Sequence, residues 1–384
     1  MLSEILVAAS VFVWLPFYFN IVLLGWGLWL TRRLDPDPSN MHNDPKKFII
    51  QVCTSGKAPK SVNSIFETIG AYDLGLPYET WVVMEEFDSN VYRADRVVKV
   101  PADFVTPKGS GAKARALEYA REVRIREGVE VESTKILFLD DDSFPERGYV
   151  EYAFHTPVEI AHGYIRTDRE YGTNLLTSVA DNFRVSDCIA TCPTFATLGK
   201  PKLIHGEGLV AKGNVEREIT WDHGGPASWG EDLMFGTEAS HQFTYGFIPH
   251  SIHIASPFTV HDLYKQRRRW LWGSLKSLPL LSRSERAFIL ARLYCGFMAI
   301  PSVVLSAYCA YAGVRWPLPL QIVFSCGTVS FVGYYMLGAW LNTHHPKRMM
   351  QTLFLFIPAA LLEAPVLLYS LLRQPKTFEV IRKE

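Results

Sequence analysis

Long hydrophobic stretches at both ends of the chain enclose a polar segment, and this division constrains the fold more than any other feature. Residues 2–30 carry one charged side chain, Glu4, and exceed the roughly 20 residues that a membrane-spanning helix needs. The stretch is too long for the apolar core of a cleaved signal peptide and no basic region precedes it, so we expect a retained anchor. Residues 287–312 and 318–341 are each long enough to span, and a third candidate covers residues 349–372. The sequence therefore predicts an integral membrane protein.

Basic residues beside these stretches predict the orientation. Lysine and arginine accumulate on the cytoplasmic side of a membrane, and four of them follow the first stretch within residues 32–47. We therefore expect the polar segment to be cytoplasmic. Residues 349–372 are interrupted by Pro358, Glu363 and Pro365, and a full crossing there would leave later basic residues outside. We expect a re-entrant or interfacial segment, with a full crossing as the alternative.

The polar segment alternates short apolar runs with helical stretches, which is the pattern of an α/β domain. Open α/β sheets bind ligands at the carboxyl ends of their strands, so we look for site residues there. We divide the chain into an anchor and linker (residues 1–44), an α/β domain (residues 45–281) and a membrane region (residues 282–384). Strands are predicted at residues 48–53, 81–84, 97–100 and 135–139, and helices at residues 60–69 and 113–126.

The charge balance and the cysteines argue against other classes of protein. The 39 basic and 39 acidic side chains give a formal net charge of zero, so no general basic field supports nucleic-acid binding. Cys188 and Cys192 are four residues apart and could share one face of a helix. No histidine or further cysteine accompanies them at the spacing of a zinc site, so we expect reduced, buried thiols rather than a metal site.

Asp140 and Asp142 follow the predicted strand at residues 135–139. A turn at this point brings both carboxylates toward one hard divalent cation, and Mg²⁺ or Mn²⁺ prefers oxygen ligands and bridges substrate phosphates. A solvated acidic turn is the alternative. Two further signals downstream favour the metal, so the sequence predicts a site for Mg²⁺ or Mn²⁺.

Glu231 and Asp232 follow a loop with Trp229 and Gly230 and precede an apolar run typical of the first turn of a helix. A carboxylate near a helix N-terminus keeps its negative charge and can take the proton of an attacking hydroxyl group. An ordinary helix cap is the alternative. We predict Asp232 as the general base and Glu231 as the neighbour that helps to place the acceptor.

Residues 265–270 read Lys-Gln-Arg-Arg-Arg-Trp and lie between apolar residues. Buried guanidinium groups need anionic partners, and a departing diphosphate supplies them, because arginine binds phosphate oxygens bidentately. A basic amphipathic helix on anionic lipid is the alternative, and we expect different faces of the helix to serve the two roles. We predict that Arg269, next to Trp270, meets the diphosphate.

In this order the three signals resemble those of glycosyltransferase family 2 enzymes, whose fold is the GT-A nucleotide-sugar domain. Processive members of that family carry a QxxRW motif, here residues 266–270. Within the family, the stretches at residues 113–119, 182–187 and 256–271 look most like those of egghead-type β-1,4-mannosyltransferases. Those enzymes use GDP-mannose and extend a membrane glycolipid.

The resemblance implies roles for individual residues. It places the donor base near Thr54 and Glu85, and the diphosphate and the metal at Asp140 and Asp142. A late histidine completes the metal shell in many GT-A enzymes, and His253 is the candidate here. Further donor contacts are implied for Lys113, Gln266, Arg269 and Trp270.

The sequence thus predicts an α/β GT-A domain with flanking transmembrane helices, acting as a membrane-bound, metal-dependent, inverting glycosyltransferase. The expected donor is a GDP- or UDP-sugar, with mannose from GDP-mannose as the candidate, and the expected acceptor is a hydroxyl group of a glycolipid or another membrane glycan. A processive polysaccharide synthase is the first alternative, although three or four helices would make a narrow exit path for a polymer. A catalytically inactive membrane scaffold is the second alternative. The presence of the acidic residues at positions 140, 142 and 231–232 argues against it.

Overall fold

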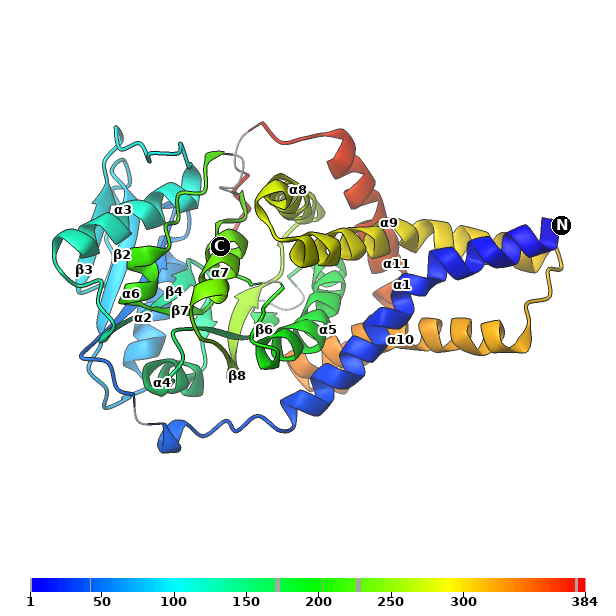
Figure 1. Ribbon diagram of the computed structural model, residues 1–384, viewed down its shortest axis with the longest axis horizontal. Helices are drawn as coiled ribbons and strands as arrows, with labels where there is room; N and C mark the ends of the chain where they lie inside the picture. The colour runs from blue at the N-terminus through cyan, green and yellow to red at the C-terminus, as the bar shows by residue number, and fades with distance from the viewer. Residues whose placement is uncertain are drawn as a thin grey trace.

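A mixed sheet of eight strands forms the centre of the polar segment (Figure 1). The computed structural model describes residues 2–41, 43–169, 173–202, 204–225, 229–376 and 379–383. The strands are β1 (Lys47–Cys53), β2 (Glu79–Glu85), β3 (Arg96–Val100), β4 (Thr134–Asp140), β5 (Phe144–Pro145), β6 (Ile160–Arg169), β7 (Leu209–Lys212) and β8 (Tyr245–Ala255). The four strands predicted from the sequence are therefore confirmed as β1, β2, β3 and β4.

The order of the strands places the ligand-binding edge. They run β3-β2-β1-β4-β7-β6-β8-β5, and the first four are parallel. The chain moves outward from β1 to β2 and β3, and then returns to β4 on the other side of β1. Such a reversal opens a crevice at the carboxyl ends of β1 and β4, where α/β proteins bind ligands.

Helices cover both faces of the sheet because alternate residues of a buried strand point to opposite sides. In β1, Ile49 packs in one hydrophobic cluster with residues of α3, α5 and α7, whereas Phe48 and Ile50 pack in another with residues of α2 and α4. The helices of the domain are α2 (Pro59–Gly70), α3 (Ala112–Arg126), α4 (Arg147–His155), α5 (Leu175–Thr197), α6 (Gly213–Glu218), α7 (Glu231–Gln242) and α8 (Val260–Ser277).

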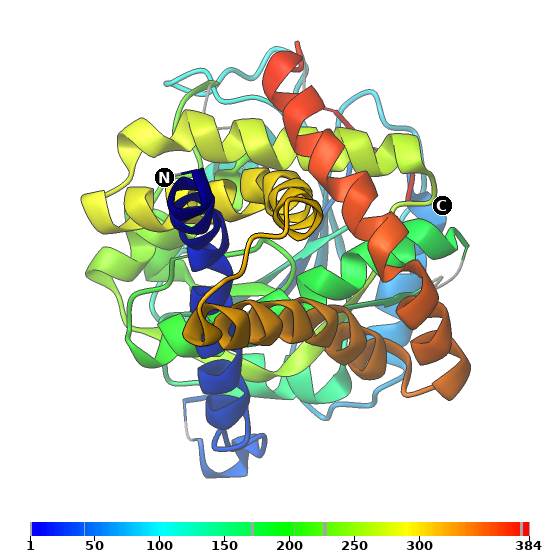
Figure 2. The ribbon, with the colours of Figure 1, turned by 90° about the vertical axis from the view of Figure 1, so that its right-hand side faces the viewer.

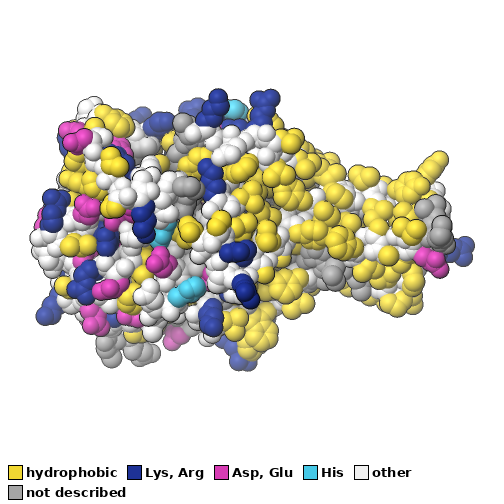
Figure 3. Space-filling view, turned by 45° about the horizontal axis from the view of Figure 1, so that its top comes forward, with side chains coloured by type: hydrophobic (Ala, Val, Ile, Leu, Met, Phe, Trp, Pro, Cys, Tyr) yellow, Lys and Arg dark blue, Asp and Glu magenta, His cyan; other side chains and the backbone are white. Residues whose placement is uncertain are grey.

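Four long apolar helices lie on one side of this domain: α1 (Leu2–Thr31), α9 (Arg283–Tyr311), α10 (Leu318–Thr343) and α11 (Pro346–Leu372). They lie in front of the sheet in Figure 2, and Figure 3 shows hydrophobic side chains covering the part that projects from the domain. Among the described residues, α1, α10 and α11 are long and apolar enough to cross a membrane, and α9, bent by 45° near residue 299, would be a fourth such helix.

The last apolar helix differs from the other three in its position. Helices α1, α9 and α10 extend together away from the domain, whereas α11 lies beside α8 (Figure 1). The Trp272 indole N–H donates a hydrogen bond to the carbonyl oxygen of Ser370 at 2.7 Å, which holds α8 against α11. Pro358 and Pro365 do not interrupt α11, because backbone groups freed by proline are tolerated where neighbouring helices pack. The topology of α11 in a membrane stays a prediction.

Candidate active site

A cavity of about 410 Å³ opens at the carboxyl ends of β1, β2 and β4, and we call it the donor cavity. Most of the side chains predicted from the sequence as site residues line it. They are Thr54, Glu85, Lys113, Asp140, Glu231, Asp232, Arg269 and Trp270. Thr54, Glu85 and Asp140 lie at the ends of β1, β2 and β4. Lys113 lies in the first turn of α3, and Glu231 and Asp232 lie in the first turn of α7. Arg269 and Trp270 belong to α8.

The acidic triplet at the end of β4 attracts cations from two other elements. The Lys113 ammonium group contacts Asp140, and the Lys383 ammonium group lies 2.6 Å from Asp141 Oδ1 and 2.8 Å from Asp142 Oδ1. Burial raises the pKa of Asp142, although Lys383 opposes that rise. Asp140 differs, because Lys113 and Lys383 outweigh its burial and lower its pKa. The triplet therefore pairs with two ammonium groups, and its role as a metal site stays a prediction. Lys383 was not predicted from the sequence to reach it.

Two of the predicted donor contacts hold other parts of the site in place. The Thr54 hydroxyl donates a hydrogen bond to Asp141 Oδ2 at 3.1 Å. The Glu85 carboxylate accepts two hydrogen bonds from Arg115 Nη1, at 2.8 and 2.6 Å. Both groups therefore lie at the rim of the donor cavity with one side already paired, which fixes their orientation.

Lys113 links the cation site to the predicted base. Its ammonium group contacts Asp140 and lies 3.2 Å from Glu231 Oε1. Burial opposes the charge of Lys113, but Asp140, Glu231 and Asp232 outweigh it and raise its pKa. Lys113 therefore stays positively charged between the three carboxylates.

Asp232 is held at the start of α7 by backbone donors. The N–H of Gly206 donates to Asp232 Oδ2 at 2.7 Å, and the N–H of Leu233 donates to Oδ1 at 2.8 Å. Burial, with a smaller contribution from the charge of Glu231, raises the pKa of Asp232 to about 7. A carboxylate with a pKa near neutrality is suited to general base catalysis, since it is both available and basic enough to take a proton.

A second cavity of about 480 Å³ lies between the domain and the apolar helices, and we call it the acceptor cavity. Its wall includes Gly296 of α9, Tyr335 of α10 and Leu367 of α11. Glu207, Trp229, Asp232 and Trp270 line both cavities. The two cavities therefore meet at Asp232.

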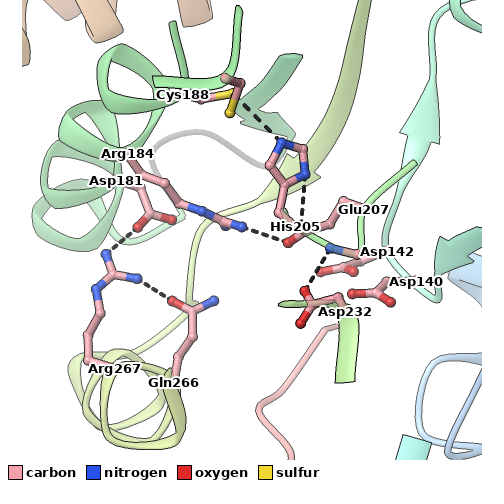
Figure 4. Close-up of polar contacts among 12 residues, drawn as sticks. Asp140, Asp142, Asp181, Arg184, Cys188, His205, Glu207, Asp232, Gln266 and Arg267 are labelled. Carbon is pink, nitrogen blue, oxygen red and sulfur yellow. Dashed lines mark hydrogen bonds and ion pairs between the residues drawn. The ribbon is translucent and has the colours of Figure 1, made fainter. Parts of the chain in front are cut away.

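Glu207 and Arg184 belong to this junction, although the sequence assigned neither of them a role. The Arg184 guanidinium donates to Glu207 Oε1 at 2.6 Å (Figure 4). It also lies 4.7 Å from the centroid of the Trp270 ring. Arg184 and His205 outweigh the effect of burial and lower the pKa of Glu207, which stays ionised. The sequence signal was the acid between Gly206 and Gly208, but no spacing linked it to the other motifs.

The three consecutive arginines of α8 point to different partners. Arg267 pairs with Asp181 at 2.6 Å and with Glu363 of α11 at 2.7 Å, and it also bonds Gln266. Arg268 pairs with Glu379. Of the three, Arg269 lines the donor cavity, where the sequence predicted it. Gln266 lies beside Arg267 rather than on the wall of the donor cavity, and its donor contact stays a prediction (Figure 4).

His253 lies apart from the donor cavity. Its Nδ1 lies 2.8 Å from the Asp168 carboxylate and its Nε2 lies 3.1 Å from Glu146. Burial opposes protonation, but the two carboxylates outweigh it and raise the pKa of His253 to about 9. A metal contact would require the ring to leave one of these partners, and this role stays a prediction.

The chain belongs to glycosyl transferase family group 2, whose profile matches residues 135–362, more than half of the chain. This match confirms the predicted class of protein, a family 2 glycosyltransferase. With the observed sheet it also confirms the predicted fold class, an α/β GT-A domain with flanking apolar helices.

Individual relatives carry mannosyltransferase names. The β-1,4-mannosyltransferase egh of Drosophila melanogaster is 29% identical over 304 residues, which cover 75% of this chain and 65% of that protein. The β-1,4-mannosyltransferase bre-3 of Caenorhabditis elegans is 27% identical over 334 residues, covering 82% and 72% of the two chains. The match thus spans less than two thirds of the Drosophila protein. Mannosyltransferase PcManGT from Pyrobaculum calidifontis, solved in complex with GDP-Man and Mn²⁺, aligns with a TM-score of 0.48 at 15% identity, covering 94% of this chain and 99% of that one.

Proposed function

We propose that this chain transfers mannose, with inversion, from GDP-mannose to a hydroxyl group of a membrane lipid-linked acceptor. The observation that carries the proposal is the meeting of two cavities at Asp232, one at the ligand-binding edge of the sheet and the other between the domain and the apolar helices. A group-transfer enzyme needs this arrangement, because the donor and acceptor must approach the same base.

The donor cavity supplies a cation site and positive charges for a nucleotide diphosphate. The contacts of the Lys383 ammonium group with Asp141 and Asp142 support a fit between the acidic triplet and a cation. The ligands would be Asp140 and Asp142, and a bound Mg²⁺ or Mn²⁺ would neutralise the diphosphate oxygens. Lys113 and Arg269 line the same cavity, where their charges can stabilise the departing diphosphate.

Asp232 performs the proton transfer in this scheme. The acceptor hydroxyl oxygen attacks the anomeric carbon while the bond from that carbon to the diphosphate oxygen breaks, and the hydroxyl proton passes to Asp232. Attack from the side opposite the leaving group inverts the configuration. The backbone donors of Gly206 and Leu233 keep the carboxylate at the junction during this step.

The acceptor cavity favours a membrane lipid over a soluble sugar. Its wall combines charged groups at the junction, such as Arg184 and Glu207, with apolar residues of the long helices, such as Phe331 and Leu367. A glycan would meet the polar end and an acyl chain the apolar end. The basic residues that follow α1 favour a cytoplasmic domain, where GDP-mannose would enter from the cytoplasm.

Labelled nucleotide sugars test this proposal. Membranes that carry the chain are incubated separately with GDP-mannose, UDP-glucose and UDP-N-acetylglucosamine, and the lipid-extractable and polymeric products are counted apart. We expect label from GDP-mannose in the lipid fraction, and about 10²- to 10⁴-fold slower labelling in membranes that carry Asp232→Asn. Transfer from a UDP-sugar alone would contradict the donor, and a polymeric product would favour a polysaccharide synthase.

A further inference from the structure

Four side chains from three separate segments lie near one another, and three of them, Cys188, Cys192 and His205, line the acceptor cavity. Cys188 and Cys192 lie one turn apart on α5, His162 lies on β6, and His205 lies in the loop before β7. Both cysteines are free and buried, as the sequence predicted. The sequence offered them no partners, because the two histidines come from distant positions and only the fold brings them near.

Several of these atoms lie close enough together for one metal ion to draw them into its coordination shell by small movements of the side chains. The Sγ atoms of Cys188 and Cys192 are 3.3 Å apart, and Cys188 Sγ lies 3.7 Å from His205 Nε2. Ligand atoms of His162, Cys192 and His205 all lie within 4.8 Å of one another. Sulfur and nitrogen ligands around a tetrahedral zinc ion are roughly 3.3 to 3.8 Å apart, because their bonds to zinc are about 2.3 and 2.0 Å long.

The buried histidine His162 has one ring nitrogen without a hydrogen-bond partner among the described residues. Its side chain has no exposed surface, and its Nε2 has no hydrogen-bond partner. A buried polar atom without a partner is costly, and a metal ion would satisfy it. Its other ring nitrogen, Nδ1, shares a hydrogen bond with the hydroxyl group of Tyr245.

His205 has the same arrangement. Its Nε2 faces Cys188, and its Nδ1 lies 3.5 Å from Glu207 Oε2 (Figure 4). Histidines that ligate zinc usually direct their second ring nitrogen to a carboxylate or another polar partner, which fixes the ring and its tautomer. Both histidines thus have one nitrogen free for an ion and the other nitrogen beside such a partner.

We propose that Cys188, Cys192, His162 and His205 bind a single zinc ion. Two thiolates and two imidazoles are the ligands that zinc prefers, whereas Mg²⁺ and Mn²⁺ prefer oxygen, so this site is distinct from the acidic triplet. Four protein ligands leave no open position, so the ion is structural. It ties α5 and β6 to the loop that carries Gly206 and Glu207, and it thereby helps to hold Asp232.

Metal analysis of the full-length chain, purified in detergent without added metal or chelator, tests the site. We expect about one zinc ion per chain, and its loss in the double variant Cys188→Ser/Cys192→Ser. Two matched controls should keep their zinc: Cys326→Ser, which changes an exposed thiol on α10, and Asp142→Ala, which removes a carboxylate of the acidic triplet. Zinc that is lost from Asp142→Ala and retained by the double variant would overturn the proposal.

Two measurements keep the test independent of whether the double variant folds. Wild-type chain loaded with Co²⁺ should show the absorption of a tetrahedral ion and a thiolate-to-cobalt charge-transfer band. Tyr245→Phe removes only the hydroxyl group beside His162 and should lower zinc affinity about 10- to 100-fold, the usual effect of losing such a partner. A wild-type chain that contains no zinc and binds Co²⁺ without the charge-transfer band would refute the site, as would a disulfide between Cys188 and Cys192 in freshly isolated chain.

Discussion

Replacement of Asp232 by asparagine separates the base from every other role of this residue. Asparagine has nearly the same shape, but its amide cannot take a proton from the acceptor. Asp232 accepts hydrogen bonds at both oxygens, from Gly206 at 2.7 Å and from Leu233 at 2.8 Å, and asparagine can retain one of them. Loss of the other costs about 1 kcal/mol, which is small beside the roughly 5 to 15 kcal/mol that stabilise a folded protein. We therefore expect Asp232→Asn to fold.

The expected effect on catalysis is much larger than the effect on stability. A positioned general base contributes about 10²- to 10⁴-fold to a rate, which corresponds to roughly 3 to 5 kcal/mol in the activation barrier. Donor affinity should change little, because the carboxylates that would hold the cation lie at the end of β4. Turnover should therefore fall by two to four orders of magnitude while the dissociation constant for GDP-mannose stays within a few-fold of the wild-type value.

The pH profile provides the decisive readout. Burial raises the pKa of Asp232 to about 7, so the carboxyl group is protonated and inactive as a base below that pH, and turnover of the wild type should rise as the pH passes through about 7. This step should be missing in Asp232→Asn and present in Asp103→Asn, which changes an exposed aspartate outside the site. Turnover in Asp232→Asn close to the wild-type value, or with the same pH step, would refute the assignment.

Substitutions at four further positions test the rest of the site. Asp142→Ala should abolish metal-dependent nucleotide binding, because Asp140 alone of the two predicted ligands would remain and would hold the ion poorly. Calorimetry with GDP and Mn²⁺ measures this binding. An affinity for GDP that excess chelator leaves unchanged would contradict a metal site. Arg269→Ala should lower turnover more than donor affinity, with partial rescue by lysine. Arg267→Ala should instead lower the free energy of unfolding by about 3 to 5 kcal/mol, because it leaves the buried carboxylate of Asp181 without its ion-pair partner. Equal, small losses at both arginines that depend on anionic lipid would favour membrane binding instead. Lys383→Ala should tighten Mn²⁺ binding, since its ammonium group contacts the same carboxylates, and an unchanged Mn²⁺ affinity by calorimetry would contradict that competition.

Local patterns in the sequence were sufficient to predict the first four strands, the helices α2 and α3 and the long apolar segments. The apolar runs at β1 and β4 and the helix formers of α3 depend on neighbouring residues alone, so their positions could be read directly. Asp140 ends its strand and Asp232 lies in the first turn of its helix, and both positions could be predicted because they too depend on neighbouring residues. Since the order of strands places these ends at one edge, Asp140, Asp232 and Lys113 all line the donor cavity, whereas Asp142 is not among its lining residues.

The tertiary structure alone decided which side chains face one another across long sequence separations. The sequence could assign Arg269 to the diphosphate, but it could not show that the neighbouring Arg267 pairs with Asp181 and Glu363, because those partners come from distant segments. Nor could it show Lys383 beside the acidic triplet, or His162 and His205 beside the two cysteines, because these contacts depend on how distant segments pack. The raised pKa of Asp232 also comes from the tertiary structure. Its main cause is burial, which depends on how the whole chain packs and not on the residues adjacent in sequence.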